Sequence, residues 1–287
     1  MSKVAEYAFQ GVTFLLFGVW WTTQILRRYY RGRLERGPTY MSSLTFPCCC
    51  HRAKHWQLEG ILKLLFSISL GITSLVAAFL SREADGQLNP SIVKYLVVAF
   101  FFGFSGVIDI IMVAHKTFLP RNTDYVFFLL AFLAQGFLQY NSLYGTPIVE
   151  EQLHLLIVYI CFGTALCLLA EMRWPKNVLF ALGRAFLVLL LGTWTFQISA
   201  ILCNPMPMKV FNWDMKDPKL LLSVTEMFAC HVWFIFIGMV LVAVIFRRLA
   251  ASGPLPPERE DGAMTELIPR GERNGQDDSH LYEISDD

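Results

Sequence analysis

Charged residues are scarce in this chain. Asp, Glu, Lys and Arg together make up 16% of its 287 residues, whereas an ordinary soluble domain contains about 25%. Hydrophobic residues reach 55%, which is more apolar surface than a soluble fold of this size normally carries. The formal net charge is only +1, so the electrostatics give no support to a nucleic-acid partner. These shortages argue against a soluble or nucleic-acid-binding domain and favour a membrane protein.

Sequence signatures of catalysis are also missing. H-E-x-x-H, G-x-S-x-G, a Walker loop and a glycine-rich dinucleotide fingerprint are all absent, which removes the strong signals for an enzyme. No pair among the seven cysteines is typical of an extracellular disulfide. The C-x-x-C spacing of a structural zinc site is absent as well. We therefore expect no enzymatic activity and no cofactor.

Long apolar runs are what the chain does contain. A helix needs about 20 residues to cross the hydrocarbon core, and seven stretches approach or exceed that length, the fourth being the shortest. They lie at about 7–26, 58–80, 92–114, 124–141, 149–170, 178–202 and 219–246. The predicted fold class is therefore all-α, a polytopic membrane protein with a bundle of seven transmembrane helices over residues 1–248. Residues 249–287 are rich in Pro, Gly, Asp and Glu, and we expect them to form a disordered acidic cytosolic tail.

Lysine and arginine are distributed unevenly between alternate connections. The connection after the first span carries five arginines between Arg27 and Arg36, and the connections after the third, fifth and seventh spans also contain basic pairs. The connections on the opposite side of the membrane carry fewer lysines and arginines. The positive-inside rule then places the N-terminus in the lumen or outside the cell and the C-terminus in the cytosol.

The run Phe100 to Ile110, FFFGFSGVIDI, combines a membrane span with two glycines and a carboxylate. Gly103, Gly106 and Asp109 recur every three residues, so they share one face of a helix. Small residues at this spacing are typical of contacts between membrane helices. An aspartate at this depth is costly to insert, which predicts that the face points into the bundle and that Asp109 finds a partner.

Two layers of polar residues are predicted inside the membrane. The first, at one depth near the cytosolic side, contains Glu59, Lys63, Asp109 and Arg184. Glu59 lies four residues before Lys63, the favourable order for a helical ion pair. We interpret the layer as an ion-pair lock between the second, third and sixth spans, with a proton or ion path as the alternative.

The second layer, on the lumenal side, contains His154 and Glu226, with His231 nearer the middle of the membrane. Histidines and carboxylates together can bind a metal or relay protons. A histidine that only hydrogen-bonds a neighbouring helix is the commoner arrangement. Glu226 and His231 are five residues apart, about 140° around a helix, so they are not a ready chelating pair.

The first connection contains three adjacent cysteines, Cys48, Cys49 and Cys50, in a basic segment close to the membrane. S-palmitoylation is one interpretation, and a reduced, unmodified cluster is the other. The expected partners are the lipid bilayer and, through this connection and the tail, membrane or cytosolic proteins.

Six motifs resemble, in order and spacing, the transmembrane protein 45 family, with a closer likeness to its transmembrane epididymal branch. They are GVTFLLFGVWW from Gly11, LEGI from Leu58, the FFFGFSGVIDI run, HLL from His154, LLGTWTFQI from Leu190 and CHVWFIFIGM from Cys230. The resemblance implies a mostly seven-helix protein without an established enzymatic activity. It also implies that Glu59, Asp109, His154, Gln197 and His231 match intramembrane polar residues of the family.

The chain departs from that pattern at the lumenal end. Lys94 and Tyr95 replace a His-His pair, and Ser142 and Tyr144 replace further histidines. If relatives bind a metal or shuttle protons there, part of that site is lost in this chain.

The leading functional hypothesis is a non-enzymatic adaptor, trafficking or structural membrane component. The alternative is a proton, ion or metal transporter or channel that uses Asp109, His154, Glu226 and His231. A receptor is less favoured, because D-R-Y after the third span and N-P-x-x-Y in the seventh are absent. An intramembrane hydrolase has only His231 and scattered acidic residues in its support.

Overall fold

A computed structural model describes residues 3–34, 39–46, 57–80, 90–115, 117–203 and 214–252. These residues form seven α-helices: α1 (Lys3–Leu34), α2 (Leu58–Leu80), α3 (Pro90–Ala114), α4 (Thr123–Asn141), α5 (Ile148–Arg173), α6 (Val178–Cys203) and α7 (Leu220–Ser252). Each predicted span coincides with one helix. α7 ends at Ser252, and the tail predicted over residues 249–287 lies beyond the described residues from 253 onward.

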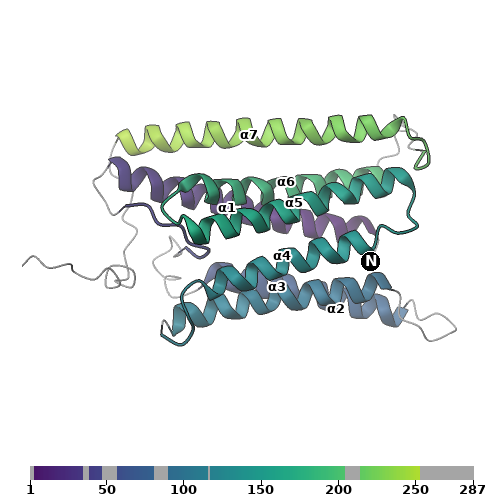
Figure 1. Cartoon of the computed structure of the whole chain (residues 1–287), viewed down its shortest axis with the longest axis horizontal. Helices are drawn as coiled ribbons and strands as arrows, with labels where there is room; N and C mark the ends of the chain where they lie inside the picture. Colours follow the sequence, from purple (N-terminus) through teal and green to yellow (C-terminus); the bar gives the residue numbers. More distant parts are fainter. Residues whose placement is uncertain are drawn as a thin grey trace, which may run out of the picture. The chain divides into compact units, whose positions relative to one another are not determined.

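The helices pack as neighbours in the order α2, α3, α4, α5, α6 and α1, with α7 on the outside (Figure 1). α2 lies against α3, and α3, α4, α5 and α6 follow one another through successive contacts. α1 returns to pack along α6, and α7 lies across α1, α5 and α6. Gly11 and Gly192 allow the close contact between α1 and α6, because a Cβ on Gly192 would lie 3.0 Å from the Gly11 carbonyl oxygen.

Aromatic side chains fill the centre of the bundle. Phe14, Phe66, Phe102, Phe128 and Phe132 are all buried, and their rings meet largely edge to face, with centroids 5.0 to 6.2 Å apart. This is the geometry that aromatic pairs prefer. The cluster joins α1, α2, α3 and α4 around one axis.

The outer faces of the helices are also apolar. Exposed Leu, Ile, Val and Phe side chains occur on every helix, and on α7 they include Phe234 and Ile237. Such a surface is typical of helices that contact lipid. Within the described part of the chain, five helices (α2, α3, α5, α6 and α7) are long and apolar enough to cross a membrane. α1 and α4 carry more polar residues, so the number of seven spans stays a prediction.

Candidate functional site

A segment of the first connection, residues 39–46, folds into one end of the bundle. It is extended, and alternate side chains (Tyr40, Ser42, Leu44 and Phe46) are buried. The Ser42 amide donates to the Pro175 carbonyl at 2.8 Å. We call residues 39–46 the loop segment and this end of the bundle the loop end. The opposite end, where α1, α3 and α5 begin, contains a small cavity lined in part by Tyr7 and His154, and we call it the cavity end.

The loop segment completes an ion pair between α5 and α6. Arg184 and Glu171 are both buried, and Nε of the arginine lies 2.8 Å from Oε1 of the glutamate. The Ser42 hydroxyl donates to Glu171 Oε2 at 2.7 Å and lies 2.9 Å from the Tyr125 hydroxyl. Nη2 of Arg184 donates to the Ser43 carbonyl at 3.2 Å, so the segment contacts both partners of the pair.

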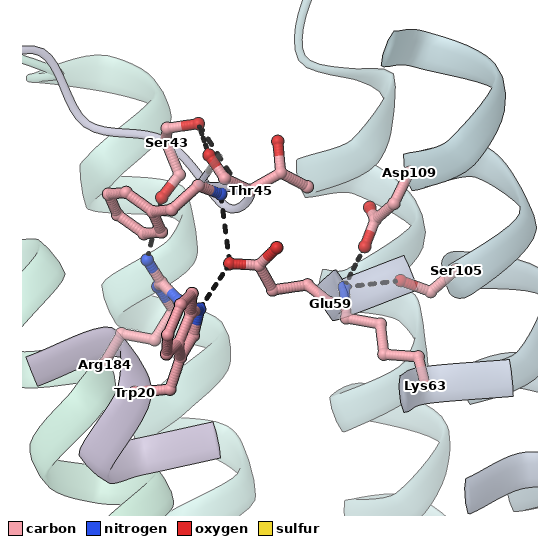
Figure 2. Close-up of polar contacts among 9 residues, drawn as sticks. Trp20, Ser43, Thr45, Glu59, Lys63, Ser105, Asp109 and Arg184 are labelled. Atoms are coloured by element: carbon pink, nitrogen blue, oxygen red, sulfur yellow. Dashed lines mark hydrogen bonds and ion pairs between the residues drawn. The ribbon is translucent and has the colours of Figure 1, made fainter. Parts of the chain in front are cut away.

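The loop segment also contacts the carboxylate of Glu59, near the start of α2. Glu59 is fully buried, and its Oε1 accepts from the Trp20 indole at 2.6 Å and from the Phe46 amide at 3.0 Å. Figure 2 shows the carboxylate of Glu59 between Trp20 and the loop segment. Glu59 therefore links α1, α2 and the loop segment. Glu59 and Lys63 have the spacing of a helical ion pair, but the hydrogen bonds of Glu59 go to Trp20 and Phe46 and the ion pair of Lys63 is with Asp109.

Lys63 instead pairs with Asp109. The lysine Nζ lies 2.6 Å from Asp109 Oδ2 and 3.4 Å from the Ser105 hydroxyl, with both partners of the ion pair buried (Figure 2). The ammonium also lies 4.0 Å from the centroid of the Phe128 ring, a cation–π contact. The face predicted from Gly103, Gly106 and Asp109 therefore does point into the bundle and meets α2.

Glycines set the distance between α2 and α3 at this pair. A Cβ on Gly106 would lie 2.8 Å from the Gly60 carbonyl oxygen and 3.0 Å from Lys63 Cβ. A Cβ on Gly103 would collide with the Ser67 hydroxyl, which donates to the Ala99 carbonyl of α3. Only a residue without a side chain permits this approach, and the approach brings the Lys63 ammonium within reach of Asp109.

The charges predicted to lock the second, third and sixth spans together lie in two separate ion pairs. The second and third spans are joined as expected, but Arg184 of the sixth span pairs with Glu171 of the fifth and not with Asp109. Sequence reasoning missed Glu171 because it lies in the last turn of a span, where a carboxylate normally reaches water. It also missed the loop segment, whose signal is the alternation of Tyr40, Ser42, Leu44 and Phe46.

Tyr40 is buried at the loop end, and its hydroxyl adds no charge to this network. Burial, with a further contribution from the Glu171 carboxylate, raises the pKa of Tyr40 to about 12. Its hydroxyl is therefore neutral at physiological pH. Nη1 of Arg184, Oε2 of Glu59 and Oδ1 of Asp109 have no hydrogen-bond partner among the described residues, and buried groups of this kind are usually completed by ordered water.

His154 belongs to a second polar group at the cavity end. Its Nδ1 lies 2.9 Å from the Glu150 carbonyl oxygen, which can only accept, so Nδ1 carries a proton. In the neutral ring Nε2 is then an acceptor, and the Tyr7 hydroxyl donates to it at 3.2 Å. Lys94 Nζ donates to Gln139 Oε1 at 3.2 Å and to the Ser142 hydroxyl at 3.3 Å. Four of these residues, Tyr7, Lys94, Gln139 and His154, border a cavity of about 30 Å³.

The structure does not assemble the other metal candidates around His154. Glu226 is exposed on α7, and the His231 ring lies edge-on to Trp194 with centroids 5.7 Å apart. In the ranges that the structure describes, no group of three or more His, Cys, Asp or Glu side chains could hold a metal ion. Gln197 of α6 donates to the Met227 sulfur at 3.6 Å. Cys48, Cys49, Cys50 and residues 253–287 lie outside the described residues.

Comparison with known proteins finds a family of unknown function and relatives that are named as transmembrane proteins. Residues 122–246 match a family described as "Family of unknown function (DUF716)". Transmembrane epididymal protein 1 of Rattus norvegicus is 27% identical over 141 residues, which cover 45% of this chain and 46% of that protein. Transmembrane epididymal protein 1A of Mus musculus matches with the same identity and coverage. The match thus spans about half the length of these relatives. Together with the apolar helices, these similarities support a multi-pass membrane protein that is related to an uncharacterised family.

Proposed function

We propose that this protein is a closed bundle of seven transmembrane helices without catalytic machinery, which acts as an adaptor, trafficking or structural component of a membrane. Its N-terminus faces the lumen or exterior and its C-terminus the cytosol. The first connection and the C-terminal tail are the parts that contact other proteins. The role accords with relatives that are named only as transmembrane proteins.

The observation that carries this proposal is the neutralisation of charge at the loop end. Lys63 is paired with Asp109 and Arg184 with Glu171, and all four side chains are buried. The cavities on the bundle axis measure only about 30 Å³ and 10 Å³, enough for roughly two water molecules and one. Paired charges separated from water hold helices together and do not offer a conducting path.

Deletion of residues 253–287 tests the adaptor role, because α7 ends at Ser252 and the helices are retained. We expect the deletion to change the subcellular distribution of the protein and the set of proteins labelled by proximity biotinylation. A matched control replaces the tail with a Gly/Ser sequence of equal length. If distribution and labelled proteins are the same for all three forms, the tail is not an adaptor element and the proposal fails.

The second candidate function is transport along the bundle axis, with Asp109 and His154 as the groups concerned. It is favoured by the position of the two cavities, which share Phe14 and Phe66 as walls and lie on the way from His154 to Lys63. Reconstitution into liposomes with pH-, halide- or zinc-sensitive dyes separates the candidates. A closed bundle gives no flux above empty vesicles, whereas flux that is lost in Asp109→Asn supports transport.

A further inference from the structure

The buried layer at the loop end contains more carboxyl groups than basic groups. Among the described residues, the charged side chains that are at most 2% exposed are Glu59, Lys63, Asp109, Glu171 and Arg184. The Lys63 ammonium lies 2.6 Å from Asp109. The Arg184 guanidinium lies 2.8 Å from Glu171. Each basic group is thus paired with one carboxylate, and the carboxyl group of Glu59 is left over.

Both hydrogen-bond donors of Glu59 are neutral groups. The Trp20 indole donates to Oε1 at 2.6 Å and the Phe46 amide at 3.0 Å. The other oxygen, Oε2, is buried and has no hydrogen-bond partner among the described residues. An ionised Glu59 would therefore be a buried charge without a counter-ion. A carboxylate in such surroundings normally binds a proton and becomes neutral.

The hydrogen bonds of Glu59 fit a neutral carboxylic acid. A carbonyl oxygen has two lone pairs, and Oε1 uses both for Trp20 and Phe46. A proton on Oε2 then makes this oxygen a donor. Figure 2 shows Oε2 turned away from Trp20, on the side of Asp109. Asp109 Oδ1 is an acceptor that also lacks a partner within the described ranges, and an ordered water can join two such atoms.

Charged or titratable groups from every neighbouring element lie around the loop end. They are Arg28 of α1, Lys63 of α2, Asp109 of α3, Asp124 of α4, Glu171 of α5, Arg184 of α6 and Tyr40 of the loop segment. In the part of the chain that the structure describes, Glu59 forms no ion pair with any of them. Tyr40, with a pKa of about 12, stays neutral at physiological pH. A proton on Glu59 is therefore what makes the buried layer electrically neutral.

We propose that Glu59 is a proton-binding site, a carboxylic acid that is protonated at neutral pH and covered by the loop segment. A glutamate in water is ionised above about pH 5, so Glu59 releases its proton when the loop segment lifts away. The proton then stabilises the closed loop segment at low pH, and this stabilisation is lost as the pH rises. The site goes beyond the adaptor role and does not depend on it.

Infrared spectroscopy of the full-length protein in nanodiscs detects the bound proton. A protonated carboxylic acid has a carbonyl stretching band that an ionised carboxylate lacks. At neutral pH we expect this band in the wild-type protein and its loss in Glu59→Gln. Glu151→Gln is the matched control, because Glu151 is an exposed glutamate at the start of α5, and it should keep the band. If no such band depends on Glu59, the proposal is overturned.

Hydrogen exchange tests the link between this proton and the loop segment. Protection factors of peptides across residues 40–46 are compared between about pH 6 and pH 8, where a glutamate in water is ionised. Because opening releases one proton, protection in the wild-type protein should fall about tenfold for each unit of pH. Protection in Glu59→Gln should not change with pH, since the amide keeps an oxygen for Trp20 and Phe46 and carries no titrating proton.

Two results would contradict the link. Constant protection in the wild-type protein would mean that opening releases no proton. An equal fall in wild-type protein and Glu59→Gln would mean that another group titrates, because histidines are common to both proteins. If Glu59→Gln does not fold, the pH dependence of the wild-type protein decides. The tail deletion and the liposome flux are read separately, so a failed proton site is distinguishable from a failed adaptor role.

Discussion

Lys63 and Asp109 stabilise the bundle only as a pair. Both are buried and their charged atoms are 2.6 Å apart, so each neutralises a charge that would otherwise lie alone among phenylalanines. Removing one partner of such a pair typically costs about 3–5 kcal/mol, whereas replacing both can be close to neutral. The pair therefore matters more for matching the two helices than for the net free energy of folding.

We expect Asp109→Asn and Lys63→Met each to lower stability by about 3–5 kcal/mol and the double variant to recover much of the loss. Stability is measured as the reversible unfolding free energy in mixed detergent micelles. The control is Lys219→Met, an exposed lysine, which should change stability by less than about 0.5 kcal/mol. Additive losses in the double variant would mean that the two side chains do not act together.

A second residue-scale prediction concerns Ser42. Its hydroxyl bonds Glu171 Oε2 and lies beside the Tyr125 hydroxyl, so Ser42→Ala leaves a buried carboxylate oxygen short of a donor. The expected cost is about 1–3 kcal/mol. Ser43→Ala is the matched control, because the Ser43 hydroxyl exchanges hydrogen bonds with the Thr45 backbone, donating to its carbonyl and accepting from its amide, rather than with a charged side chain. Equal unfolding midpoints for the two variants would remove Ser42 from the network.

Sequence reasoning located interior charges better than it located their partners. Lys63, Asp109 and Arg184 stand out because a charge inside an apolar run is visible in one dimension. Whether Arg184 meets Asp109 or Glu171 depends on how each helix is rotated about its axis, and a single sequence does not specify that rotation. Glu171 and Ser42 were missed for a related reason, since each lies at or beyond the end of a span and becomes buried only when the loop segment folds back.

At the scale of elements, the contact between α2 and α3 depends on two glycines that face each other. A methyl group on Gly106 would meet the Gly60 carbonyl oxygen at 2.8 Å, so the helices must separate. We expect Gly106→Ala to cost about 1–3 kcal/mol and to loosen the pair between Lys63 and Asp109. Gly71→Ala on α2 is the control, because a Cβ there meets nothing within 4 Å.

Thermal unfolding of the two glycine variants in the same detergent gives the comparison. Gly71→Ala should leave stability unchanged or raise it by about 0.5–1 kcal/mol through the higher helix propensity of alanine. A similar loss in both would indicate that alanine is unfavourable in this helical hairpin generally. Destabilisation restricted to Gly71→Ala would contradict the packing described above.

The loop segment is the element for which sequence and structure differ most. The sequence draws attention only to the cysteines of the first connection. In the structure, however, residues 39–46 are packed and hydrogen-bonded to α2, α5 and α6. The amides of Ser42 and Phe46 donate to Pro175 and Glu59, and such amides exchange slowly with solvent. Hydrogen-exchange mass spectrometry should therefore show peptides across residues 40–46 protected at least about tenfold over an unstructured chain, and exchange at the intrinsic rate would contradict the packing.

At the scale of the whole molecule, the number of helices could be predicted from the sequence, because an apolar run of about 20 residues is long enough to form one membrane-length helix. Among the described helices, five are long and apolar enough to cross a membrane, and α1 and α4 are not among these five. α4 is the shorter of the two at 19 residues and contains Gln135 and Gln139. Both glutamines border the cavity at the cavity end, so they lower the hydropathy of α4 without facing lipid. We therefore predict that α4 crosses the membrane.

Cysteine labelling decides whether α4 crosses. Phe118 and Tyr144 flank α4 and are 71% and 99% exposed, so Phe118→Cys and Tyr144→Cys in a cysteine-free background report the two connections. A membrane-impermeant maleimide applied to intact cells should label Tyr144→Cys, and Phe118→Cys only after permeabilisation. Leu166→Cys on the outer face of α5 is the control for burial in lipid and should stay unlabelled in both conditions. Labelling of both flanking positions from one side would mean that α4 does not cross, and the order of sides along the chain after it would then be reversed.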